Sequence, residues 1–183
     1  RPTPGAVTRG RCYTPGHPAK ETRMRAFQIF SAMPPEEAQK VFEAIAEKSP
    51  VTFQQGLATA CTTLKIRPVF LKKQPFEKKA KLVRRALSQV ASDDIAEEIL
   101  AAYFLECRKD LLTGWLDALG IDHEDGTLGE DNPAEPEAKA LAKAHRAFLE
   151  ADTDSDRVLL VRAFAAQAAI DWPGLDGLIA ADV

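Results

Sequence analysis

The stretch "IAEEILAAYFLECRKDLLTGWLDAL", residues 95–119, decides the fold class. Its apolar residues recur at the three- and four-residue spacing of an α-helix and cover more than half of the helix circumference. A helix that is apolar so far round is typical of the centre of a helical bundle. We therefore predict two central helices here, separated near Lys109–Asp110. The apolar positions are Ile99, Leu100, Tyr103, Phe104, Leu111, Leu112, Trp115 and Leu116.

Helical patterns continue on both sides of this stretch. Residues 24–33, 36–48, 49–66 and 76–90 each show helical spacing, and residues 135–151, 154–170 and 171–181 follow it. Gly120 followed by Ile121 predicts a Schellman stop to the central helix. No stretch alternates as a strand does, and no repeat of fixed period occurs. The predicted fold is all-α, an irregular single-domain bundle of about seven or eight helices.

The amphipathic pattern is clearest in residues 76–90. Phe76, Ala80, Val83, Leu87 and Val90 fall on one face at 100° per residue, which predicts a buried stripe. Lys78, Lys81 and Arg85 fall on the opposite face, which predicts a basic strip in contact with solvent.

The first residues, "RPTPGAVTRGRCYTPGHPAKETR", have no apolar periodicity and are rich in proline and glycine. This composition predicts a disordered arm, a linker or a non-native upstream segment over residues 1–23, with a helical domain over residues 24–183. His17 lies in this arm and is not a candidate for any site.

Composition indicates a globular chain. Of its 183 residues, 45% are hydrophobic and 28% are charged, and no apolar run approaches the ~18 residues of a membrane span. The three cysteines, Cys12, Cys61 and Cys107, are far apart and form no CxxC pair, so we expect a reducing cytoplasm and no disulfide framework. Cys61 and Cys107 lie in helical patterns and are predicted to be small buried hydrophobes.

Charge is distributed asymmetrically along the chain. Residues 1–91 contain 17 basic and 6 acidic residues, whereas residues 92–183 contain 7 and 21. Nine of the basic residues fall between positions 65 and 85. We predict an interaction surface there and expect a protein partner rather than a membrane. Its candidate residues are Lys72, Lys73, Lys78, Lys81, Arg84 and Arg85.

Four interpretations of this basic strip remain open. It can bind an acidic protein, it can contact the protein's own acidic half, it can bind nucleic acid through residues 65–85, or it can be a solvated helix face without a partner. Only Phe70 and Phe76 accompany the strip and the sequence pI is about 5.7, so a dedicated nucleic-acid binder is not favoured.

The acidic segment over residues 122–131 is the second candidate. It contains Asp122, His123, Glu124 and Asp125, followed by Glu130 and Asp131. Consecutive side chains in a turn point apart, and Asp125–Gly126 is a turn dipeptide, so we predict a mobile, solvated connector over residues 122–134. A metal site or a catalytic loop is the alternative.

The motif "DTDSDR", residues 152–157, resembles the first half of a calcium-binding loop. Arg157 and Ala163 occupy the positions where such a loop needs glycine and a bidentate glutamate, so an EF-hand is excluded. Asp152, Asp154 and Asp156 are predicted to end one helix and cap the next. His145, beside the apolar face of its helix, is predicted to be a histidine at the edge of the core.

Signatures of common enzyme classes are missing from the sequence. It contains no Walker loop, GxGxxG, HExxH or GxSxG motif, and no cofactor is expected. The most direct functional interpretation is a non-enzymatic binding or scaffold module that acts through a charged surface.

The segments "IRPVF", "KKAKLVRRAL", "IAEEILAAYFLECRKDLLTGWLDALGIDHEDGT" and "DWPGLDGLI" together give the chain an overall resemblance to a set of uncharacterised bacterial proteins. The resemblance spans most of residues 24–180 and implies an all-helical fold, with Met24 as the beginning of the domain. It includes no functional motif and therefore implies no site residues.

Overall fold

The structure is a computed structural model that describes residues 23–129 and 133–182. Within these residues the chain forms ten α-helices, a short 3-10 turn, one π-helical segment and a hairpin of two-residue strands. The elements in order are α1 (Ala26–Ala32), α2 (Pro35–Lys48), α3 (Pro50–Thr63), α4 (Pro68–Lys72), α5 (Phe76–Leu87), η1 (Val90–Ser92), α6 (Asp93–Ala102), η2 (Tyr103–Cys107), α7 (Lys109–Leu119), β1 (His123–Glu124), β2 (Thr127–Leu128), α8 (Ala138–Glu150), α9 (Asp156–Ala166) and α10 (Pro173–Ala181).

The predicted all-α bundle is confirmed. The structure has ten helices in the described ranges rather than about seven or eight, and α4 (Pro68–Lys72) is a short helix that no predicted pattern covered. None of the helices in the described ranges has the length and apolar character needed to cross a bilayer.

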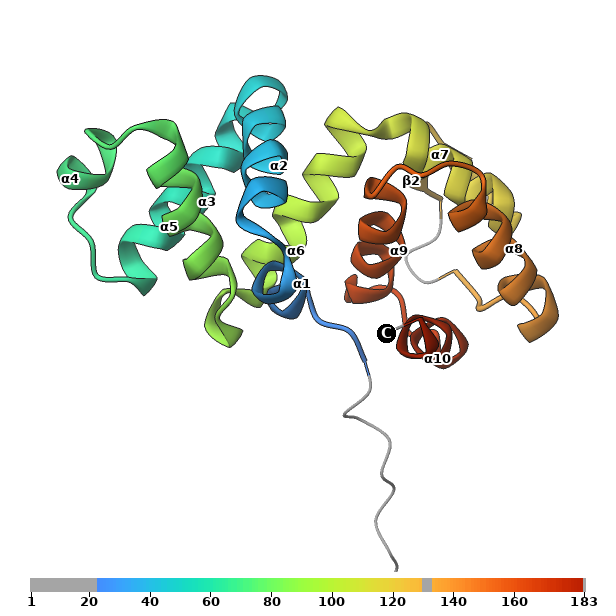
Figure 1. Ribbon diagram of the computed structural model, residues 1–183. Helices are drawn as coiled ribbons and strands as arrows, with labels where there is room; N and C mark the ends of the chain where they lie inside the picture. The colour runs from blue at the N-terminus through green and yellow to red at the C-terminus, as the bar shows by residue number, and fades with distance from the viewer. Residues whose placement is uncertain (1–22, 130–132, 183) are drawn as a thin grey trace, which may run out of the picture.

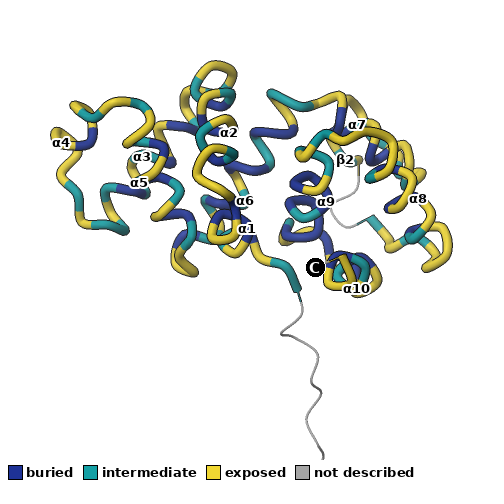
Figure 2. Tube along the Cα trace, in the orientation of Figure 1, coloured by how far each residue is buried: buried dark blue, intermediate teal, exposed yellow. Residues whose placement is uncertain are grey.

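A central helical segment joins two groups of helices. Helices α1–α5 lie on one side in Figure 1 and α7–α10 lie on the other, with α6 between them. Helix α6 packs against α1, α3 and α9, and η2 packs against α2 and α7. Figure 2 shows the buried residues along the facing sides of these helices. The predicted central position of residues 95–119 is therefore confirmed, and all eight of its named apolar residues are buried.

The central segment is interrupted close to the predicted position. Helix α6 widens into the π segment η2, where the N–H of Arg108 donates to the carbonyl of Tyr103 at 3.1 Å. Arg108 then leaves the helical conformation and α7 begins at Lys109. At the far end of α7, Gly120 has a φ of 69° and the N–H of Ile121 donates to the Leu116 carbonyl at 3.0 Å. This is the expected Schellman stop.

The stripe predicted for residues 76–90 is correct except at its end. Ala80, Val83 and Leu87 are buried, and Phe76 is partly buried and stacked on Phe53 with ring centroids 5.3 Å apart. Val90, however, is 59% exposed. Helix α5 ends at Leu87, so Val90 opens the separate turn η1 and leaves the buried face.

The beginning of the chain lies almost wholly outside the described residues. Residues 1–22, which include Cys12 and His17, are not described, and the predicted arm stays a prediction there. Arg23 is described, and its guanidinium donates to the carbonyl of Gln167. Cys61 and Cys107, predicted to be buried, are only partly buried and pack against the edge of the core.

Substitution of the α5 stripe tests this packing. Val83 is fully buried, so Val83→Asp places an uncompensated charge in the core and should lower the free energy of unfolding by roughly 3–5 kcal/mol. Lys78→Asp on the exposed face of the same helix should leave the urea midpoint nearly unchanged. Urea unfolding followed by circular dichroism measures both, and equal losses would show that the two faces are wrongly assigned.

Candidate functional site

A hollow lies at the end of the molecule formed by α3, α4 and α5. It has a volume of about 690 Å³. Its lining contains apolar residues of α3 and α4 and a lysine on each of α4 and α5. The lining residues are Gln54, Leu57, Ala58, Cys61, Thr62, Pro68, Leu71, Lys72 and Lys79. We call this hollow the α3–α5 groove.

The local sequence explains why a groove forms. After α3, Lys65 adopts a φ of 54° and the N–H of Ile66 donates to the Cys61 carbonyl, so the chain turns sharply. Pro68 then occupies the first turn of α4, where its missing N–H costs no hydrogen bond. Helix α4 is only five residues long, and Leu71 is its one buried side chain. Because Leu71 is its only buried side chain, this short helix packs against α3 through one residue. The space beside α5 is therefore not filled.

Large apolar side chains are exposed around the groove. Val69 and Phe70 on α4 are 67% and 51% exposed, and Val51 at the start of α3 is 73% exposed. Val51 precedes Gln54 and Ala58 by three and seven residues, so it lies on the groove side of α3. Neighbouring exposed apolar residues such as Val69 and Phe70 are typical of a binding surface.

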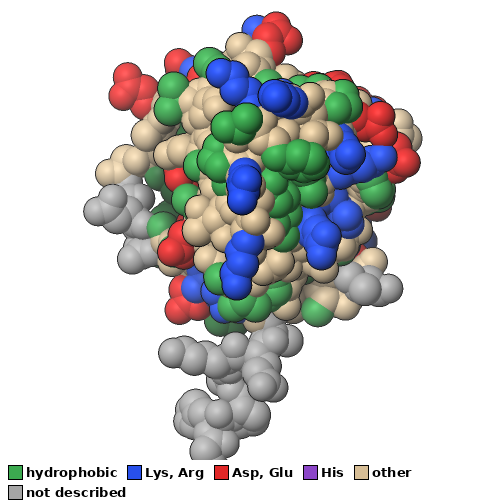
Figure 3. All heavy atoms as spheres, turned by 90° about the vertical axis from the view of Figure 1, so that its left-hand side faces the viewer, with side chains coloured by type: hydrophobic (Ala, Val, Ile, Leu, Met, Phe, Trp, Pro, Cys, Tyr) green, Lys and Arg blue, Asp and Glu red, His purple; other side chains and the backbone are tan. Residues whose placement is uncertain are grey.

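Positive charge surrounds the same apolar patch. Six basic residues lie between positions 65 and 79, and none of them forms an ion pair with another described residue: Lys65, Arg67, Lys72, Lys73, Lys78 and Lys79. Figure 3, which faces this end, shows Lys and Arg side chains among hydrophobic ones, with acidic side chains towards the edge of the view.

The one acidic residue in this region is already paired. Glu77 accepts a hydrogen bond from Lys81 at 2.6 Å, one turn along α5. This pairing lowers the pKa of Glu77 and raises the pKa of Lys81. The groove therefore presents a net positive field to any molecule that approaches it.

The six residues predicted to form the interaction surface have different surroundings in the structure. Lys72 lines the groove, and Lys73, Lys78 and Arg85 are exposed. Lys81 is exposed but paired with Glu77. Arg84 turns inward, and its guanidinium donates to the carbonyls of Met33 at 2.8 Å and Ser31 at 3.2 Å, at the end of α1.

Arg84 is therefore a structural residue and not part of a free surface. Lys79, which lines the groove, was not among the residues predicted for the interaction surface. Helical spacing puts Lys79 beside the buried Ala80, but only the position of α3 shows which flank of α5 borders the groove.

Residues 123–128 of the acidic segment form a β-hairpin around the predicted Asp125–Gly126 turn, and the mobility predicted for residues 122–134 stays a prediction. His123 pairs with Leu128 and Glu124 pairs with Thr127. Asp125 and Gly126 have φ values of 56° and 90°, as a two-residue type I′ turn requires. The strands are too short to show sequence alternation, which is why the hairpin was not predicted. Glu130 and Asp131 lie outside the described residues.

The hairpin is held in place by its own polar side chains. His123 Nδ1 accepts the N–H of Gly126 at 3.2 Å, and Nε2 lies 3.2 Å from Asp117 Oδ1. Lys109 pairs with Asp125 at 2.8 Å. Both imidazole nitrogens are engaged, and no group of three metal-ligating side chains occurs in residues 23–129 and 133–182. A metal centre built on His123 is therefore not supported.

The continuation of this segment joins α10. Trp172 Nε1 donates to the Pro133 carbonyl at 2.9 Å, and Glu135 Oε1 accepts the N–H groups of Gly174 at 2.7 Å and Leu175 at 3.2 Å. Glu135 thereby satisfies two of the open donors at the start of α10.

The aspartates of "DTDSDR" close a polar cluster at the end of the π segment. Arg108 donates to Asp154 at 2.7 Å and also pairs with Asp156. Tyr103 Oη donates to the same Asp156 carboxylate at 2.7 Å. Burial and the Asp156 carboxylate both raise the pKa of Tyr103. Of the aspartates predicted to cap α9, Asp154 accepts the N–H of Asp156 with Oδ1 at 3.0 Å, whereas the N-cap residue is Ser155, whose side chain makes no capping hydrogen bond.

His145 lies where the sequence placed it, at the edge of the core. It is buried on α8, and its Nε2 lies 3.5 Å from Asp182 Oδ2. Burial lowers its pKa, and the Asp182 carboxylate opposes this effect. The neutral ring therefore contributes to packing at neutral pH.

Comparison with known proteins adds no functional assignment: no family model, no curated protein and no solved structure matches the chain.

The hairpin turn can be tested at Gly126. A Cβ at this position would lie 2.9 Å from Leu112 Cδ2, and the residue has a positive φ. Gly126→Ala should therefore lower the free energy of unfolding by roughly 1–3 kcal/mol. Gly129→Ala, where a Cβ meets nothing within 4 Å, is the matched control in thermal unfolding. A neutral Gly126→Ala would show that the turn is not packed on α7.

The Arg108 cluster predicts a pH dependence. The hydrogen bond from Arg108 lowers the pKa of Asp154 below its usual value, so its stabilising effect is present above pH ~4 and is lost as the pH falls through the native pKa. Asp154→Asn should reduce the melting temperature at pH 7, and the difference from wild type should shrink as the pH falls below ~4. Asp110→Asn, which removes a 3.7 Å contact of the same arginine, should show a small difference at both pH values.

Proposed function

We propose that this protein is a non-enzymatic binding module, and that the α3–α5 groove binds an acidic amphipathic helix of a partner protein. One observation carries the proposal: a hollow of about 690 Å³, exposed apolar side chains and basic residues without an ion pair in the described chain coincide at one end of the molecule. Each feature alone is common on protein surfaces, whereas together they provide both an apolar floor and a charged rim.

The chemistry of the groove favours a helix as the ligand. A bound amphipathic helix inserts apolar side chains at positions i, i+3 or i+4, and i+7. Leu57, Cys61 and Leu71 offer it an apolar floor, and the volume of about 690 Å³ accommodates several side chains. Carboxylates on the flanks of such a helix would meet Lys72 of α4 and Lys79 of α5, which both line the groove.

Nucleic acid is the second candidate because six basic residues without ion pairs also suit a phosphate backbone. Two features weigh against it. Phe70 is the only exposed aromatic side chain in the described chain, so no platform for several stacked bases is present there. The chain also carries a net charge of −3, and its acidic second half would repel a long polyanion.

Fluorescence anisotropy with designed probes tests the proposal. We expect a labelled helical peptide with leucines on one face and glutamates on its flanks to bind, and a scrambled peptide of the same composition to bind at least tenfold more weakly. Lys72→Glu with Lys79→Glu should weaken peptide binding at least tenfold, because two attractive contacts become repulsive. Lys139→Glu with Lys143→Glu on α8, away from the groove, is the matched control for net charge.

Salt dependence separates the two candidates. Binding that depends on apolar contact should survive an increase in salt from 50 to 200 mM with a small loss, whereas phosphate contacts of this number would lose roughly a thousandfold. Equal affinity for the ordered and scrambled peptides, or stronger and steeply salt-dependent binding of a DNA or RNA oligonucleotide, would contradict the proposal. Light scattering of the protein alone checks that self-association does not account for the signal.

A further inference from the structure

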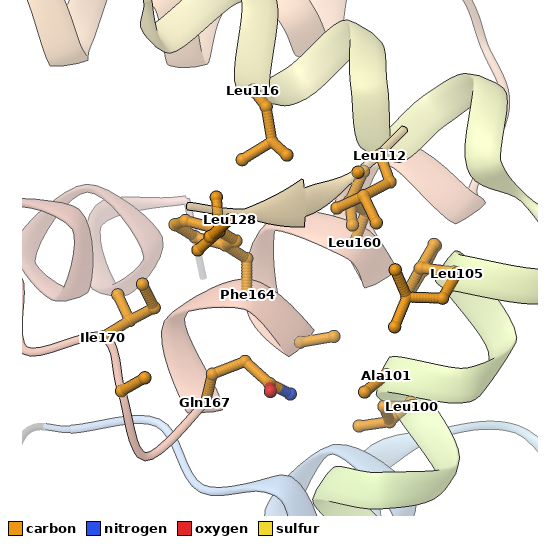
Figure 4. Close-up of a pocket in the computed structure, with 14 residues that line it drawn as sticks. Leu100, Ala101, Leu105, Leu112, Leu116, Leu128, Leu160, Phe164, Gln167 and Ile170 are labelled. Atoms are coloured by element: carbon orange, nitrogen blue, oxygen red, sulfur yellow. The ribbon is translucent and has the colours of Figure 1, made fainter. Parts of the chain in front are cut away.

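A second, smaller hollow lies between α6, α7, α9 and the hairpin, and it differs chemically from the groove. Its volume is about 130 Å³. Figure 4 shows that leucine, isoleucine and phenylalanine side chains converge on it from these elements. The labelled lining residues are Leu100, Ala101, Leu105, Leu112, Leu116, Leu128, Leu160, Phe164, Gln167 and Ile170.

Two irregular elements keep this cavity from being filled. The π segment ends the regular helix of α6, and it leaves Leu105 at the rim, 37% exposed. π-helical segments of this kind often lie at functional sites. On another wall the hairpin contributes Gly126, which has no side chain, and its backbone lies against Leu112. A larger residue at position 126 would push Leu112 aside, so the shape of the cavity depends on this glycine.

Gln167 is the single polar side chain of the lining. Its backbone is fixed, because its N–H donates to Phe164, and its carbonyl accepts from Ile170 and from the guanidinium of Arg23. Its carboxamide forms no hydrogen bond with any described residue, and Figure 4 shows it directed towards Leu100 and Ala101. An amide in an apolar hollow gains from a ligand that offers it one polar partner.

We propose that this cavity binds a small uncharged molecule with an apolar ring or branched hydrocarbon group and one hydroxyl or amide that pairs with Gln167. The size fits, since an apolar cavity of about 150 Å³ lined by similar residues accommodates benzene. A charged ligand is excluded, because the lining contains no ionised group to pair with it. The site is independent of the α3–α5 groove, with which it shares no lining residue.

Thermal unfolding with three probes of similar size tests this site. Toluene and phenol should raise the melting temperature, by roughly 3–6 °C at ten times Kd, and phenol should have the larger effect at equal concentration. Benzoate should have none. Gln167→Leu should remove the preference for phenol over toluene while retaining toluene binding, because only the hydroxyl partner is lost.

Two neighbouring alanines of α6 provide a matched pair. Ala101 lines the cavity and Ala102 does not, although both are partly buried. Ala101→Leu should fill the cavity and abolish the response to toluene and phenol, whereas Ala102→Leu should retain it. Should either variant fail to fold, methyl NMR of the wild-type protein decides: toluene should shift the methyl signals of Leu116 and Leu128 and leave those of Leu57 and Leu71 in place.

Three outcomes would overturn the proposal. These are the absence of any response to toluene and phenol, toluene binding by Ala101→Leu with wild-type affinity, and methyl shifts that are strongest outside the cavity.

Discussion

The burial of one continuous segment, α6 followed by the π segment, is the constraint on which the rest of the structure depends. Ile99, Leu100 and Phe104 are almost completely removed from water, and this burial requires helices from both halves of the chain. Gly56 on α3 permits the close approach, because a Cβ there would lie 3.1 Å from Ile99 and 3.2 Å from Val83. Since both helical groups pack on the same segment, the positions of α3 and α5 beside the groove follow from the core.

Basic and acidic residues are concentrated at different ends of the molecule. The basic half of the chain forms the end with the groove, and the acidic half contains the hairpin, α8 and α10 (Figure 1). Several acidic residues of the second half form contacts within the fold. Asp154 and Asp156 form ion pairs with Arg108, and Glu135 caps α10. The basic residues between positions 65 and 79 form no ion pair with any residue of the described ranges. This difference supports a role for them in recognition, since unpaired like charges close together do not stabilise a fold.

Sequence reasoning predicted the regular elements well and the irregular ones poorly, for physical reasons. Apolar spacing over residues 95–119 reports burial directly, so the central segment was predicted with its interruption and its Gly120 stop. Val90 continues the periodicity of α5, but the helix ends three residues earlier, and periodicity alone does not mark that end. Arg84 and Lys79 look equivalent in sequence, yet Arg84 caps a helix more than 50 residues away while Lys79 lines a groove. Such roles depend on tertiary packing. The hairpin is an intermediate case, since Asp125–Gly126 suggested a turn but its two-residue strands are too short to alternate.

The central claim is that the α3–α5 groove contacts an acidic segment of a partner protein, and site-specific photo-cross-linking in the native host tests it most directly. A photoreactive residue at Ala58, on the groove wall, is compared with one at Ala147, exposed on α8. The account predicts that Ala58 cross-links to one segment rich in Asp and Glu, with apolar residues at helical spacing, as mapped by mass spectrometry, and that Ala147 does not. Cross-links from Ala58 to nucleic acid, to segments without acidic character, or to the same products as Ala147 would contradict it.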